Sequence, residues 1–114
     1  MGGNGIIAKG KVYGSSIASG ADFLSADVSP SDGRSTFRLS VQLSGAAKII
    51  VTSDDGLSGG KDHTLNNDTD RAAGCLYTFV WGVDAEYTYN LKHDDAGALT
   101  VDYCLLDEIT QGAI

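Results

Sequence analysis

Apolar and polar residues alternate along residues 35–44 more regularly than anywhere else in the chain. Successive side chains of a strand point to opposite faces of a sheet, so this alternation predicts a strand with one buried face. Four apolar residues are expected to point into a core and four polar residues outward: Phe37, Leu39, Val41 and Leu43 against Arg38, Ser40, Gln42 and Ser44.

Three further segments of period two follow Cys75 and are separated by short turns. In the first of them, residues 76–82, both alternating faces carry apolar bulk, which favours a strand packed on two sides. The three segments hold six of the nine aromatic residues of the chain: Tyr77, Phe79, Trp81, Tyr87, Tyr89 and Tyr103.

The remaining sequence predicts shorter strands at residues 6–13, 21–28 and 48–53, with turn residues between them. Residues 54–70 are polar and are expected to be mostly loop, with Leu65 as an apolar anchor. No segment has helical spacing of its apolar residues over three turns.

Seven or eight strands with a turn signal about every ten residues predict an all-β protein, a single antiparallel β-sandwich of jelly-roll or immunoglobulin-like type. A length of 114 residues fits one domain spanning 1–114. We expect a Gly-rich N-terminal arm at about residues 1–10 and a short C-terminal tail at 110–114.

The formal net charge is −7, with 15 acidic against 8 basic residues. A nucleic acid or an anionic membrane requires clustered Lys and Arg, so the sequence predicts neither partner. The start of the chain does not resemble a signal peptide, and synthesis in a cytoplasm is expected. In that compartment Cys75 and Cys104 are expected as buried thiols, with a disulfide between them as the alternative.

Residues 56–60 match the G-x-S-x-G pattern of a nucleophile elbow, with Ser58 as nucleophile and His63 or His93 as base. An elbow needs a strand-to-helix turn, however, and glycines follow Ser58. A glycine-rich loop is the better interpretation, so no catalytic residue and no cofactor is predicted.

The candidate metal ligands are Asn66, Asp68 and Asp70, which offer oxygen atoms within one loop. A solvated acidic loop is the simpler interpretation, because neither possible EF-hand register ends in the required Glu. The adjacent acidic pair Asp107–Glu108 cannot form a catalytic dyad on a strand, since neighbouring side chains face opposite ways.

Trp81, Tyr87 and Tyr89 have the ring types that stack on sugars, which leaves a carbohydrate-binding module as an alternative function. Aromatic residues at alternating strand positions more often belong to a core.

Residues 37–109 contain, in order, a polar loop with Asn66 and Asn67, the Ala73-Gly74 lead-in, an aromatic strand and Tyr89-Asn90. This succession of turns and strands resembles small β-sandwich virion proteins of tailed bacteriophages. The resemblance implies a non-enzymatic capsid decoration (cement) protein, or a tail or fibre component, made in the host cytoplasm and located in the virion.

The same resemblance implies the major capsid protein, or another virion protein, as partner, and a homo-oligomer, with a trimer as the expected form. A Gly-rich end can become ordered by adding a strand to a neighbour. We therefore expect the partner-binding residues in the N-terminal arm, at Ile6, Ile7, Lys9 and Lys11.

Overall fold

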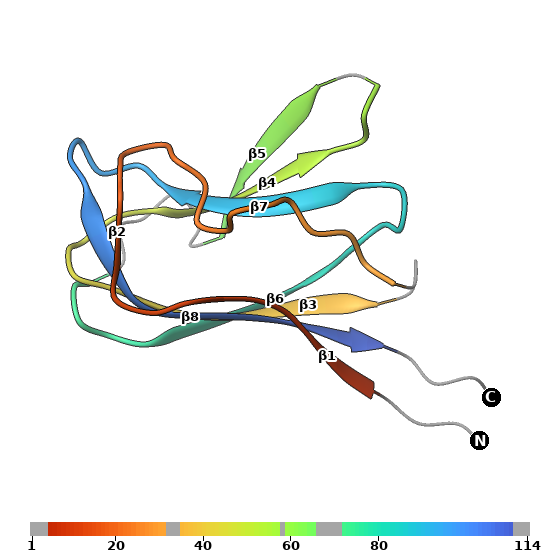
Figure 1. Ribbon diagram of the computed structural model, residues 1–114, viewed down its shortest axis with the longest axis horizontal. Coiled ribbons are helices and arrows are strands. Elements are labelled where there is room, and N and C mark those ends of the chain that lie inside the picture. The colour runs from red at the N-terminus through yellow and green to blue at the C-terminus, as the bar shows by residue number, and fades with distance from the viewer. Residues whose placement is uncertain (1–4, 32–34, 58, 66–71, 111–114) are drawn as a thin grey trace.

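The computed structural model describes residues 5–31, 35–57, 59–65 and 72–110. They form eight strands in two antiparallel sheets that lie face to face (Figure 1), which confirms the predicted all-β sandwich. The strands are β1 (Gly5–Val12), β2 (Ser15–Ile17), β3 (Thr36–Leu43), β4 (Ile49–Asp54), β5 (Gly60–Thr64), β6 (Tyr77–Gly82), β7 (Thr88–His93) and β8 (Leu99–Thr110).

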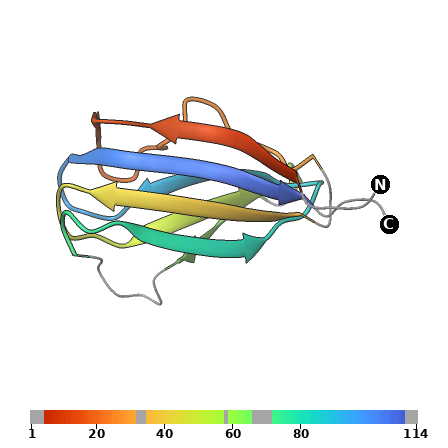
Figure 2. The same cartoon turned by 90° about the horizontal axis from the view of Figure 1, so that it is seen from below.

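The larger sheet has the strand order β1-β8-β3-β6, seen side by side in Figure 2, and β2 pairs with the beginning of β8. The smaller sheet has the order β5-β4-β7. Gly5 pairs with Thr110, so the first and last strands meet at one end of the larger sheet. Residues 5–10, which were predicted as part of an N-terminal arm, therefore belong to a strand paired within this chain.

The core lies between the two sheets and begins with the alternation of β3. Phe37, Leu39 and Val41 are fully buried, as predicted, while the polar residues between them lie on the outer face. The ring of Phe37 packs edge-on against Trp81, with ring centroids 6.0 Å apart, and against Tyr89, with centroids 5.4 Å apart. One side chain therefore joins both sheets. Each fully buried side chain of this size contributes about 1.5–3 kcal/mol.

The predicted strand at residues 21–28 is wrong, because this segment is irregular and makes only one isolated bridge, Val28 with Tyr89. The segment runs along β7, and hydrogen bonds from the side chain of Asn90 hold it there in place of a regular backbone ladder. Its Oδ1 accepts from the Leu24 amide at 3.0 Å, and its Nδ2 donates to the Leu24 carbonyl at 3.1 Å.

A strand also forms where a loop was predicted. Gly60–Thr64 is β5, which pairs with β4 and leaves four of its five residues exposed. A strand without a buried face has no apolar alternation, so β5 could not be recognised from its sequence pattern. Leu65 packs against the core at its end, as predicted.

Strand β6 is packed on one side only, which corrects the prediction of two packed sides. It is an edge strand: Phe79 and Trp81 face the core, while Val80 on the other face is 60% exposed. Cys75, in the irregular segment before β6, is exposed, which corrects its prediction as a buried thiol, whereas Cys104 is buried as predicted. Both thiols are free, and burial raises the pKa of Cys104 to about 12.

Replacing Phe37 by Ala should lower the free energy of unfolding by about 3–5 kcal/mol, because it opens a cavity where both sheets meet. Val80→Ala is the matched control on the same sheet, and its effect should stay within about 0.5 kcal/mol. Urea denaturation of both variants measures the difference. Equal losses would contradict the placement of β3 and β6.

Candidate functional site

Strand β1 is one edge of the larger sheet and pairs with β8 from Gly5↔Thr110 to Val12↔Cys104. Among the described strands β8 is its one neighbour, so the other side of β1 is an open edge. The register shifts between Ala8 and Gly10, which makes a β-bulge at Lys9. A bulge bends an edge strand and re-aims the side chain it carries.

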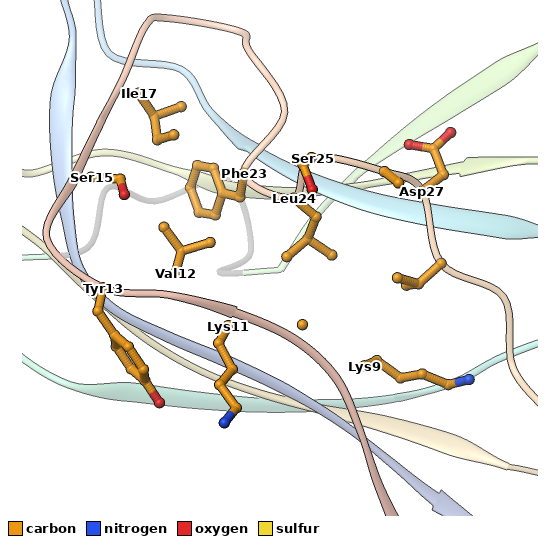
Figure 3. Close-up of a pocket in the computed structure, with 13 residues that line it drawn as sticks. Lys9, Lys11, Val12, Tyr13, Ser15, Ile17, Phe23, Leu24, Ser25 and Asp27 are labelled. Atoms are coloured by element: carbon orange, nitrogen blue, oxygen red, sulfur yellow. The ribbon is translucent and has the colours of Figure 1, made fainter.

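A groove of about 470 Å³ lies beside this edge, between β1 and the irregular segment 23–28. Figure 3 shows Lys9 and Lys11 on the β1 side of the groove and Phe23 and Leu24 on the opposite side. The groove is thus the open side of the sandwich, where the edges of the two sheets approach each other.

Two features fix the wall of the groove that segment 23–28 provides. Asn90 holds Leu24 as described above and also donates from Nδ2 to Asp27 Oδ1 at 2.9 Å. On the other wall, a Cβ added at Gly10 would lie 2.6 Å from Leu24 Cδ2. The absence of a side chain at Gly10 therefore lets β1 approach Leu24 closely.

A buried carboxylate holds β1 to the rest of the molecule. Glu108 of β8 is fully buried on the inner face, and its Oε1 lies 3.3 Å from Lys9 Nζ. The Ser31 amide donates to Oε2 at 2.8 Å, and the Ser31 hydroxyl donates to Oε1 at 3.0 Å. Burial alone would raise the pKa of Glu108, but the nearby Ser35 hydroxyl, the hydrogen bonds from Ser31 and the ion pair with Lys9 lower it to about 2.

The structure separates the four predicted partner-binding residues by role. Ile6 is 63% and Ile7 39% exposed, and Lys11 is exposed as well, so these three remain available for contact. Lys9 is turned inward to Glu108 and has a structural partner. Whether any of the four binds a partner stays a prediction.

The outer face of the larger sheet carries an apolar stripe next to the open edge. Ile6 pairs with Ile109, and the Tyr13 and Tyr103 rings lie 5.3 Å apart. Sequence reasoning missed the contribution of β8, although its alternation would have indicated it: Leu106 and Glu108 point inward, so their neighbours point outward. The β1–β8 stripe consists of Ile6, Tyr13, Tyr103, Leu105 and Ile109. Two charged residues lie on the same face, Lys11 opposite Leu105 and Asp107 between Leu105 and Ile109.

The candidate hydrolase residues are not brought together in the part of the chain that the structure describes. His63 is exposed on β5, whereas His93 is buried with Nε2 2.8 Å from the Ile17 carbonyl and Nδ1 accepting from the Asp95 amide. Ser58 lies outside the described residues, so its geometry as a nucleophile stays untested.

The candidate metal ligands Asn66, Asp68 and Asp70 also lie outside the described residues. Within residues 5–31, 35–57, 59–65 and 72–110, no group of three or more His, Cys, Asp or Glu is placed to hold a metal ion. Asp107 and Glu108 face opposite sides of β8, as predicted, and so cannot form a catalytic dyad. Asp107 pairs with Arg38 on the outer face at 2.9 Å, while Glu108 points inward.

No helix long and apolar enough to cross a membrane occurs among the described residues. The chain matches no known protein-family model, and a search of the curated proteins finds no similar sequence.

Glu108→Gln should lower the free energy of unfolding by about 2–3 kcal/mol at neutral pH, because the charged hydrogen bonds to Ser31 and Lys9 are lost. The wild type should also lose stability as the pH falls from about 4.5 towards 2, since the unfolded chain binds the proton first. The variant should lose less in that window, as measured by denaturation at a series of pH values.

Asp107→Asn is the matched control, because it removes the neighbouring carboxylate from a partly exposed ion pair on the outer face. Its effect at neutral pH should be at most about 1 kcal/mol. A Glu108→Gln variant with the acid profile of the wild type would contradict the assignment.

Proposed function

We propose that this protein is a non-enzymatic structural component of a phage virion, a capsid decoration protein that braces neighbouring capsid subunits. The observation that carries the proposal is the open edge of β1 directly beside the β1–β8 stripe. Together they offer backbone donors and acceptors next to apolar side chains, which is what a contact surface needs.

The open edge supports binding by strand addition. An extended partner segment can hydrogen-bond along β1, while the adjoining groove receives alternate side chains of that segment. The bulge at Lys9 and the exposed charge of Lys11 disfavour unspecific pairing with other edges. The edge is therefore suited to one partner rather than to aggregation.

The stripe supports the same function through its composition. Interface cores are depleted of charge and enriched in aromatic residues, and Tyr is frequent among the residues that dominate binding energy. Tyr13, directly after β1, and Tyr103 of β8 pack on each other, and Ile6 and Ile109 lie toward the other end of the same two strands. Asp107 of β8 lies between Leu105 and Ile109 within the stripe and forms an ion pair with Arg38 of β3, so one charged pair divides its apolar residues.

The proposed partner is the major capsid protein, and the proposed assembly is a homo-oligomer, with a trimer as the expected form. Both come from the resemblance to phage virion proteins, as does location in the virion.

The proposal predicts the chain in particles purified from the phage whose genome encodes it, detected by mass spectrometry. Particles that lack the chain should assemble but lose integrity at lower temperature or in low salt, because the bracing contacts are missing. Absence of the chain from purified particles would refute the proposal.

Ile6→Asp should weaken rebinding of the purified protein to such depleted particles at least tenfold, because it places a charge in the stripe. Leu57→Asp is the control: Leu57 is 92% exposed but lies in a turn away from the stripe. Circular dichroism establishes that both variants fold. Equal binding of the two variants would show that the stripe is not the contact surface.

A further inference from the structure

A second cavity, of about 380 Å³, lies at the opposite edge of the larger sheet, beside β6. Residues from β4, β5, β6, β7 and the turn before β7 converge on it, so both sheets contribute. Its volume falls within the range of about 300–1,000 Å³ that is typical of small-molecule sites. The residues used below are Ser53, His63, Trp81, Asp84, Tyr87 and Tyr89.

The aromatic side of this cavity is backed by the core. Tyr87 is partly exposed and stacks on Tyr89 with ring centroids 6.3 Å apart and planes 25° apart. Tyr89 in turn packs on Phe37, and so does Trp81. The ring positions are therefore set by contacts in the interior, and a ligand would meet a preformed wall.

The polar groups of the cavity are few and of different kinds. The amide of Asp84 donates to the Tyr89 hydroxyl at 2.9 Å, which fixes the turn, and its exposed carboxylate is an acceptor. Ser53 and His63 line the cavity from β4 and β5. Among the described residues, the buried Nε1 of Trp81 has no hydrogen-bond partner, which is rare and costly for an indole.

We propose that this cavity binds a neutral sugar residue. The negative face of an aromatic ring attracts the C–H groups of a sugar, and the groups around it can bond to hydroxyls. Oδ1 of Asp84 already accepts from the Glu86 amide at 3.0 Å, and the carboxylate keeps acceptor capacity for a sugar hydroxyl. Its negative charge repels phosphates and carboxylates.

The residues changed in the test below, Asp84 and Tyr87, line neither the β1 groove nor the β1–β8 stripe, although Tyr89 of β7 is bonded through its backbone to Val28 of that groove. A failure of either test therefore leaves the other inference standing.

Trp81 is the only Trp in the chain, so fluorescence excited at wavelengths that tyrosine does not absorb reports on this cavity. Titration with glucose, galactose, mannose and N-acetylglucosamine, and with short oligosaccharides of each, should give a saturable change with at least one of them. Saturation by a monosaccharide shows that the cavity binds a single sugar ring. Saturation by an oligosaccharide alone shows that binding needs several linked rings. No saturable change with any sugar up to tens of millimolar would overturn the proposal.

Tyr87→Ala and Asp84→Ala should each weaken the binding at least fivefold, because they remove the stacking surface and the carboxylate. Tyr87→Phe keeps the ring and should bind within twofold of the wild type, which separates loss of stacking from loss of folding. Val80→Ala is the control, since Val80 is next to Trp81 on β6 but is 60% exposed on the opposite face of the strand. Wild-type affinity in both folded alanine variants of the cavity would overturn the proposal.

Discussion

The structure depends on the burial of apolar side chains between two sheets, and Phe37 is at the centre of that contact. It is fully buried on β3 and touches Trp81 of the same sheet and Tyr89 of the opposite one. A single aromatic contact network therefore sets the spacing of the sheets and the positions of the cavity rings beside β6. Because the large apolar residues fill this interior, the proposed binding surfaces lie at the edges and on the outer face of the sandwich.

Two buried polar residues then shape the β1 side. Asn90 binds both backbone groups of Leu24, and this holds the irregular segment against β7 without a regular ladder. Glu108 joins β8 to Lys9 and Ser31, so the edge strand is held by charge as well as by backbone pairing. A buried carboxylate is costly unless it is bonded, which ties the geometry of the open edge to these few contacts.

The sequence predicted the elements that have a buried face and missed those that lack one. The alternation around Leu39 identified β3 correctly, whereas β5 has four exposed residues and so left no pattern. The error at residues 21–28 has another cause. The segment has a strand-like composition, but it is held by the amide side chain of Asn90, 66 positions after Leu24, and that contact is not visible in the local sequence. The sequence does not show that Lys9 has a partner, because Glu108 comes to lie beside it only in the folded chain. Lys9 was therefore predicted as a contact residue.

The central claim is that this protein acts through the open edge of β1 and not through chemistry inside the sandwich. Hydrogen–deuterium exchange of the full chain, free and bound to virus particles, tests this claim most directly. The account predicts that binding slows exchange of the β1 amides, while those of β3, already protected in the sheet, change little. Unchanged exchange along β1, with new protection confined to other strands, would contradict it.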